Sequence, residues 1–215
     1  MEKAQKKPSF WERLLFSETL RAKSLAHRIA YVSVITALNV VTNFVEIKFL
    51  DTQFSFTIIL SLLSGIALGA VAGFGSCFIG DLLGFFMRGG IYMPWVALST
   101  ATFALLSGAS IAFLPFRFKG GLALRMAIVC ILSFAVCTIA INSTGFYFYN
   151  KVMGFSTAVV DYANKHFGSG LTYWIYVAYR LFFKGQIWNS LVNYALFFVL
   201  LPILTKIKQL GIKVE

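Results

Sequence analysis

The amino-acid sequence predicts an all-α integral membrane protein, a bundle of six transmembrane helices. Its composition is 59% hydrophobic and only 13% charged, and its mean hydropathy is +0.79. A soluble domain of 215 residues with this balance would expose more apolar surface than it could hide from water. Residues 121–148 hold a single charge, Arg125, over a length that at about 1.5 Å per residue crosses the roughly 30 Å hydrocarbon core of a bilayer. We therefore expect the chain to lie in a membrane.

Turn-forming and charged residues divide the chain into six apolar spans. These spans cover residues 29–47, 54–71, 76–87, 92–114, 121–148 and 185–203. The third span follows a glycine-rich stretch and ends before Arg88 and two further glycines, so it is too short to cross a bilayer upright. We expect this short third helix to pack against protein, with its end opening on a cavity.

The six spans form a membrane domain of residues 26–208 that has a tail on each side. Residues 1–25 form a basic cytoplasmic tail, and residues 209–215 form a cytoplasmic C-terminal tail. Within the first tail, residues 10–20 have the pattern of an amphipathic helix at the membrane surface, with Trp11 in the headgroup layer. A tail that is merely solvated is the alternative.

A long outer loop, residues 149–184, separates the fifth span from the sixth. It is polar at its start and aromatic later, in the run YWIYVAYRLFF. A loop of this length is usually functional or disordered, and its aromatic content argues against disorder. We expect it to hold one or two short helices over the membrane face.

Basic residues set the orientation of the chain. With six spans and both termini in the cytoplasm, most of the 19 Lys and Arg residues fall on the cytoplasmic side. The sequence therefore predicts a multi-pass protein of the cell membrane with both termini cytoplasmic. The net charge of +11 then reflects topology and contact with anionic membrane lipid, and no nucleic acid is needed as a partner.

Four ionisable side chains in or beside the spans are candidates for binding a ligand. Asp81 is the only acid in the interior of an apolar span, since Glu46 lies at the polar end of the first, and an ionised carboxylate in lipid is costly unless it is paired or solvated. It would contact a ligand or form an ion pair at the base of a pocket, or alternatively pair only to hold helices together. Arg88, Arg180 and Lys184 lie near the outer ends of spans, where they would attract an anionic solute. The alternative for each is an anchor at the membrane interface.

Aromatic and amide side chains complete the candidate substrate-binding site. Tyr92 and Trp95 lie on the same side as the cations, and Asn142 and Asn189 place amides inside spans. Flat walls with a few aimed polar groups suit a heterocyclic ligand. An interfacial aromatic belt would have the same sequence pattern, and the amides could instead bond across helices.

The sequence lacks the patterns that mark an enzyme. It contains no HExxH, no GxSxG, no P-loop and no paired carboxylates within the spans. We therefore predict no catalytic residue, no metal site and no cofactor, and the chain cannot hydrolyse ATP by itself. A small six-span protein with a rim pocket and no energy source is typical of a binding subunit.

Several segments together resemble a known family. Residues 54–108 contain a small-residue turn after the second span, the pattern of Gly80, Asp81 and Gly84, and the run GIYMP ahead of the fourth span. Two later segments are INSTGFYFY and YRLFFKGQIWNSLVN. The first group resembles the central part of the substrate-binding S components of energy-coupling factor (ECF) vitamin transporters, and the second is similar to the last two spans of the folate-type members. The resemblance covers roughly residues 26–208.

The resemblance implies a high-affinity binding subunit of an ATP-dependent vitamin importer. Such a subunit associates with an ECF transmembrane coupling subunit and two ATPase subunits, and it delivers its ligand by toppling in the membrane. The family docks through an AxxxA face on its first span, and the nearest match here is Ser33 and Ala37. Its first outer loop acts as a gate, and the matching stretch is residues 48–53.

Three hypotheses about the ligand follow from these features. Folate leads, because a pterin suits aromatic walls and amides while its glutamate tail suits the cationic rim. Another vitamin of the same transporter class, such as pantothenate or cobalamin, comes second. The third hypothesis belongs to a different class, a membrane scaffold or assembly protein without a small ligand, for which the small-residue faces and the basic tail would suffice.

Overall fold

The computed structural model describes residues 9–49, 52–89, 91–114, 118, 120–168 and 170–206. The predicted C-terminal tail, residues 209–215, lies outside these ranges, and so do residues 1–8 of the predicted N-terminal tail.

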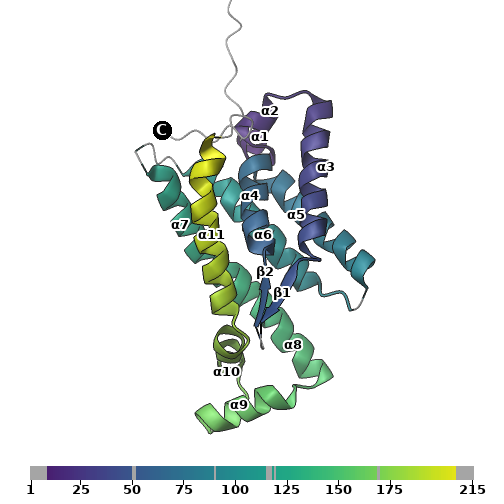
Figure 1. The fold of residues 1–215 in the computed structure, drawn as a ribbon, viewed down its shortest axis with the longest axis vertical. Helices are drawn as coiled ribbons and strands as arrows, with labels where there is room; N and C mark the ends of the chain where they lie inside the picture. Colours follow the sequence, from purple (N-terminus) through teal and green to yellow (C-terminus); the bar gives the residue numbers. More distant parts are fainter. Residues whose placement is uncertain are drawn as a thin grey trace, which may run out of the picture.

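Helices form most of the described chain, and two short strands form a hairpin. The elements are α1 (Phe10–Leu15), α2 (Glu18–Arg21), α3 (Leu25–Thr42), β1 (Glu46–Phe49), β2 (Thr52–Ser55), α4 (Thr57–Leu68), α5 (Ala70–Arg88), α6 (Pro94–Phe113), α7 (Gly121–Ser133), η1 (Phe134–Ser143), α8 (Thr144–Met153), α9 (Thr157–Phe167), α10 (Tyr173–Ala178), η2 (Tyr179–Phe183) and α11 (Gln186–Lys206). The segments η1 and η2 are π-helical. The long helices form one elongated bundle, with α1 and α2 at one end and the hairpin, α9 and α10 toward the other (Figure 1).

Five helical stretches in the described chain are long and apolar enough to cross a membrane. They are α3, α5, α6, the continuous stretch α7–η1–α8, and α11. This architecture agrees with the predicted all-α, multi-pass membrane protein. α4 has only 12 residues but is buried on most of its surface, because α5 and α6 pack against it. The short helix of the bundle is therefore the second apolar segment.

The prediction of a short third helix is wrong. α5 runs for 19 residues, because the glycines expected to break it are helical. The break lies at Gly69, whose φ of +101° is a conformation that strains any residue with a Cβ. Gly73 has a packing role instead, since a Cβ there would lie 2.8 Å from the Cα of Gly65 on α4. The glycine-rich stretch thus allows two helices to approach closely.

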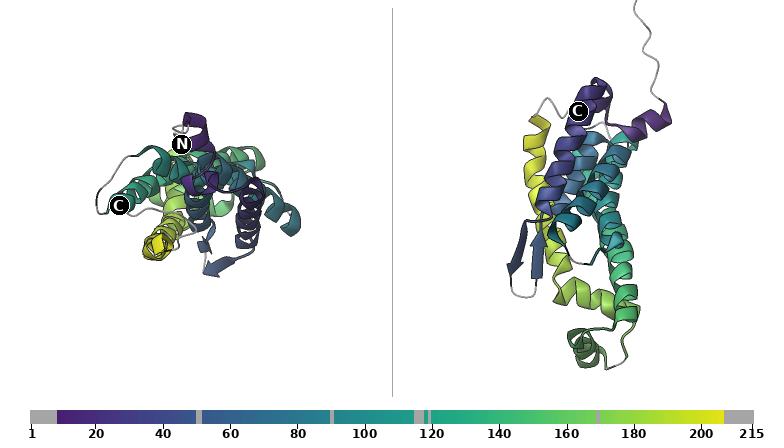
Figure 2. Two further views of the ribbon diagram at one scale, coloured as in Figure 1. Left: turned by 90° about the horizontal axis from the view of Figure 1, so that it is seen from above. Right: turned by 90° about the vertical axis from the view of Figure 1, so that its right-hand side faces the viewer.

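The fifth apolar span is longer than the sequence predicts. The helix begins at Gly121 as expected but continues without a break to Met153, a run of 33 residues. At about 1.5 Å per residue it exceeds the roughly 30 Å core of a bilayer, so α8 extends past the neighbouring helices at the hairpin end (Figure 2). Its middle part, η1, has the wider turn of a π-helix, and there the Oγ of Ser143 donates to the carbonyl of Thr138 at 2.8 Å.

The segment predicted as an outer loop is largely helical in the structure. α8 occupies its beginning, and α9 and the α10–η2 pair follow. Val159, Tyr176 and Tyr179 are buried together there, with further aromatic side chains packed around them. We call α8, α9, α10 and η2 the helical cap.

The N-terminal elbow, α1 and α2, closes the opposite end of the bundle. The Ser17 N–H donates to the carbonyl of Leu68 at 2.8 Å, and the Ser17 Oγ donates to the carbonyl of Ala67 at 2.7 Å. These carbonyls end α4 and have no partner within that helix. The predicted interfacial helix over residues 10–20 is therefore two short helices, because Ser17 leaves the helical conformation to cap α4.

Replacing Gly73 by Ala should lower the free energy of unfolding by about 1–3 kcal/mol, because a Cβ has no room between α5 and α4. Gly75→Ala, two residues along the same helix, is the matched control. A Cβ at Gly75 would meet nothing within 4 Å, and Ala has the higher helix propensity. Thermal unfolding of both variants in detergent compares them, and equal losses of stability would contradict this packing.

Candidate functional site

A polar cavity of about 140 Å³ lies where five elements meet near the hairpin. The end of β2 and the start of α4 form one wall, and α6, η1 and α11 form the others. The lining side chains are mostly hydroxyls and amides: Ser55, Thr57, Ile58, Val96, Ser99, Thr100, Phe103, Thr138, Asn142, Gln186 and Asn189. We call it the amide cavity. It brings together Asn142 and Asn189, two of the residues predicted to bind substrate.

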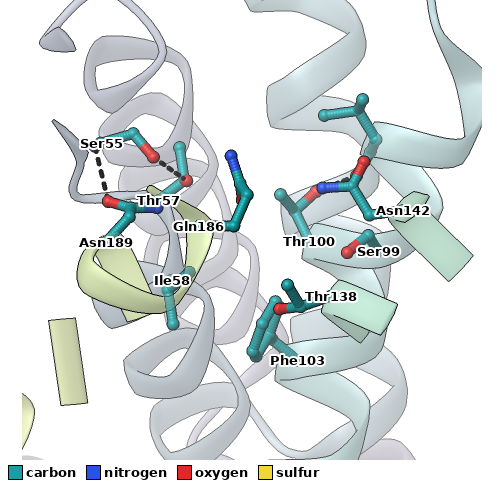
Figure 3. A pocket seen from close by; sticks show the side chains of 11 residues that line it. Ser55, Thr57, Ile58, Ser99, Thr100, Phe103, Thr138, Asn142, Gln186 and Asn189 are labelled. Carbon is teal, nitrogen blue, oxygen red and sulfur yellow. Dashed lines mark hydrogen bonds between the residues drawn. The ribbon is translucent and has the colours of Figure 1, made fainter. Parts of the chain in front are cut away.

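Gln186 lines the amide cavity from the start of α11. Its side chain extends between Ser55 and Asn189 on one side and Thr100 and Asn142 on the other (Figure 3). Amides and hydroxyls offer both hydrogen-bond donors and acceptors. The cavity can therefore recognise a neutral ring that carries both kinds of group.

Two asparagines hold the hairpin against α11. The Asn189 Oδ1 accepts from the Ser55 N–H at 3.1 Å, and the Asn193 Nδ2 donates to the Ser55 carbonyl at 2.8 Å. The Asn193 Oδ1 also accepts from the Ile59 N–H at 3.4 Å, at the first turn of α4. These amides therefore form hydrogen bonds between elements of the fold, which was the alternative to ligand contact in the sequence analysis. The bonds hold this wall of the cavity in place.

Asn142 is different, because its Oδ1 is buried and has no hydrogen-bond partner within the described part of the chain. It lies on η1, which the Ser99 Oγ ties to α6 by donating to the Cys137 carbonyl at 3.0 Å. An unsatisfied buried acceptor costs about 1–3 kcal/mol, and π-helical segments are frequent at functional sites. An N–H or O–H of a molecule in the amide cavity would satisfy the Asn142 oxygen.

A second cavity, of about 300 Å³, lies in the helical cap. Its walls are aromatic and polar: Phe146, Asn150, Ser156, Val159, Tyr176, Tyr179, Arg180, Lys184 and Gln186. We call it the arginine cavity. Arg180 and Lys184, both predicted to bind substrate, line it together, and Gln186 lines both this cavity and the amide cavity.

Trp95 and Arg180 both contact Phe146. The Arg180 Cζ lies 4.1 Å from the centroid of the Phe146 ring, and the Trp95 ring lies 5.6 Å from the same ring, edge to face. The Trp95 Nε1 is buried and finds no hydrogen-bond partner among the described residues. Trp95 therefore lies beside the arginine cavity, although it does not form part of its described lining.

Besides Trp95, three predicted site residues line neither cavity. Asp81 and Arg88 lie two turns apart on α5 and interact electrostatically. The Tyr92 ring follows that helix and lies 4.9 Å from the ring of Phe85. The described linings of the two cavities include none of these three, so their part in binding a substrate stays a prediction.

The predicted docking residues lie on an open face of α3. Ser33 and Ala37 are exposed, one turn apart. They line a shallow groove of about 470 Å³ that also includes Leu83 of α5. α3 is the least buried of the five candidate membrane helices. This face is therefore available to lipid or to another protein.

Sequence analysis missed Gln186 and the hydroxyl side chains of the amide cavity. Gln186 follows directly after Lys184 and Gly185 at the start of α11, and its position beside a predicted cation is the one signal that would have selected it. Ser99 and Thr138 are polar residues inside apolar spans, but hydroxyls are common in membrane helices. Nothing local distinguishes them from packing residues.

Comparison with known proteins identifies no relative of this chain. No protein-family model matches the chain, and no curated protein matches it. A proposal for its function therefore rests on the two cavities, the open face of α3 and the sequence resemblance.

Asn193→Ala should lower the free energy of unfolding by about 1–3 kcal/mol, because it leaves the Ser55 carbonyl and the Ile59 N–H without their buried partner. Asn142→Ala should leave it unchanged or raise it, since the Oδ1 has no hydrogen bond to lose and its unsatisfied burial is removed. Thermal denaturation of the two purified variants in detergent measures the difference. The reverse order of stabilities would contradict the hydrogen-bond assignment.

Proposed function

We propose that this protein is the substrate-binding S component of an ECF-type vitamin importer, with folate as its leading ligand. The observation that carries the proposal is the amide cavity, where the buried Asn142 oxygen lacks a partner beside Gln186 and several hydroxyls. Ligand sites typically combine apolar walls with a few converging polar groups. The resemblance of residues 54–108 to S components adds the vitamin class.

The two cavities suit the two chemical parts of a folate. The amide cavity, at about 140 Å³, is smaller than the roughly 300–1,000 Å³ of pockets that hold a whole drug-sized molecule. It suits a single ring system such as a pterin, whose donors and acceptors match Asn142 and Gln186. The anionic glutamate tail would reach toward Arg180 and Lys184, and Gln186, which lines both cavities, supports their proximity.

In the proposed topology the chain passes between the two sides of the membrane six times. The second passage is the segment of β2 and α4, since α4 alone has 12 residues and is enclosed by α5 and α6. α4 connects the hairpin end of the bundle with the end that the elbow closes (Figure 1). α1 and the last turn of α11 lie at the same end, which an even number of crossings requires. With both termini in the cytoplasm, the helical cap and the hairpin face the outside, where a vitamin arrives, and the hairpin has the position of the family's gating loop.

Association with a coupling subunit and two ATPases completes the proposed transporter. The exposed Ser33 and Ala37 leave room for a partner helix to approach closely on α3. This face is separate from the residues that line the two cavities. Docking and ligand binding are therefore separable by mutation.

Folate should stabilise the purified protein, by about 2.7 kcal/mol when held at 100 times its Kd. Asn142→Ala should weaken binding at least tenfold, about 1.4 kcal/mol, because a ligand donor loses its acceptor. Asn164→Ala, at an exposed position on α9, is the control and should bind as the unchanged protein does. A thermal-shift screen against water-soluble vitamins measures both effects. Stabilisation by pantothenate or cobalamin alone would replace folate, and no stabilisation by any vitamin would favour the scaffold hypothesis.

Ala37→Trp should abolish vitamin uptake while purified protein still binds its ligand, because the added bulk blocks the close approach of a partner helix. Ile131→Trp, at a side chain of α7 that is 74% exposed, is the control for bulk placed in lipid. Copurification with the coupling subunit and the ATPases measures docking directly. Normal copurification of the Ala37→Trp variant would rule out this face as the docking site.

A further inference from the structure

Arg180 is a buried cation at the centre of the helical cap. Its side chain is only 8% exposed, and its guanidinium lies over the Phe146 ring at 4.1 Å. It belongs to η2, which lies outside the five stretches that are long and apolar enough to cross a membrane. Arg180 is therefore buried by the helical cap, whose aromatic side chains pack around it.

The charge of Arg180 is not balanced within the part of the chain that the structure describes. No carboxylate there forms an ion pair with it, and its Nε has no hydrogen-bond partner. Burial lowers the pKa of the guanidinium, and Tyr176 partly opposes this, but an arginine keeps its proton in proteins. A single cation–π contact does not offset the cost of burying a charge that has no counter-ion. An anion beside Arg180 would remove that cost.

The arginine cavity provides the space for such an anion. Lys184 lines the same cavity one turn further along and remains exposed, so two cations face it from one side. Tyr176 and Tyr179 provide flat walls, and the Asn150 Nδ2 steadies the first of these by donating to the Tyr176 hydroxyl at 2.9 Å. Like charges on neighbouring turns repel, and an anion between them offsets the repulsion.

We propose that the arginine cavity is a binding site for a carboxylate carried on an aromatic or other apolar stem. The planar guanidinium of Arg180 matches the two oxygens of a carboxylate, Lys184 adds charge at the mouth, and the tyrosine walls pack against the stem. The inference rests in part on the proposed function, which already directs a glutamate tail toward these two cations, and it deepens that function by giving the carboxylate either of two sources. The carboxylate belongs to the tail of a vitamin whose ring fills the amide cavity, or to a separate small acid.

Three probes and the full-length protein in detergent test the site. p-Aminobenzoylglutamate represents a vitamin tail, benzoate represents a separate acid, and 6-hydroxymethylpterin is a ring without a carboxylate. Arg180→Met should weaken binding of the carboxylate probes at least tenfold and leave the pterin unchanged. It should also raise the melting temperature of the ligand-free protein, because an unpaired buried charge is replaced by an apolar side chain.

Three further variants separate charge, geometry and folding. Arg180→Lys keeps the charge but loses the planar fork, so it should recover only part of the affinity. Lys184→Gln changes an exposed side chain, keeps the fold, and should still weaken the carboxylate probes several-fold. Lys165→Gln removes an exposed cation of α9 that is not part of the described lining, and it should bind every probe as the unchanged protein does.

The outcomes distinguish this site from the proposed function. If Arg180→Met lowers the melting temperature of the ligand-free protein and binds the carboxylate probes normally, Arg180 is only a support for Phe146 and the inference fails. If neither carboxylate probe binds the unchanged protein while the pterin does, the inference fails and the vitamin proposal stands. If a carboxylate probe binds through Arg180 and no pterin or vitamin binds, the inference stands and the vitamin proposal fails. Binding of both carboxylate probes identifies a separate acid, and binding of p-aminobenzoylglutamate alone identifies the vitamin tail.

Discussion

Close backbone contact among α4, α5 and α6 is the constraint on which the rest of the structure depends. In lipid there is little hydrophobic drive for helices to associate, so they associate where small side chains let backbones touch. Gly73 meets Gly65 across α4 and α5, and Gly108 of α6 leaves no room for a Cβ against Ala70. These contacts enclose the short α4. They also place its first turn, with the attached hairpin, against α11, where the amide cavity forms.

Buried polar groups divide into those the fold satisfies and those it does not. Asn189 and Asn193 form hydrogen bonds with the hairpin and with the start of α4, so they fix the geometry of the cavity wall. The Asn142 oxygen and the Arg180 Nε are buried without a partner in the described chain. Natural proteins tolerate such local costs mainly at functional sites. In the proposed site the satisfied amides form a wall, and the Asn142 oxygen and the Arg180 Nε are the groups that a ligand would contact.

The long helix α7–η1–α8 connects these two unsatisfied groups. Its π-helical middle presents Asn142 to the amide cavity, and its extension beyond the bundle carries Phe146, on which Arg180 lies. The same helix thus supplies one wall to each cavity, and Gln186 of α11 lines both. A ligand that engages both cavities would tie the helical cap to the membrane bundle.

The amino-acid sequence by itself predicted an all-α membrane protein, and the five long apolar helices agree with it, because hydropathy and charge spacing are local properties. The predicted bounds of α6 and α11 differ from the observed ones by at most a few residues. The sequence also places Arg180 and Lys184 about one turn apart. It did not show that Gly69 breaks the helix while Gly73 packs it, since both are glycines in one apolar run and only their neighbours differ. It also did not show that Asn193 holds the hairpin while the Asn142 Oδ1 has no partner among the described residues. Only the tertiary structure decided which amide is satisfied, because Ser55 and Ile59, the partners of Asn193, lie far away along the chain.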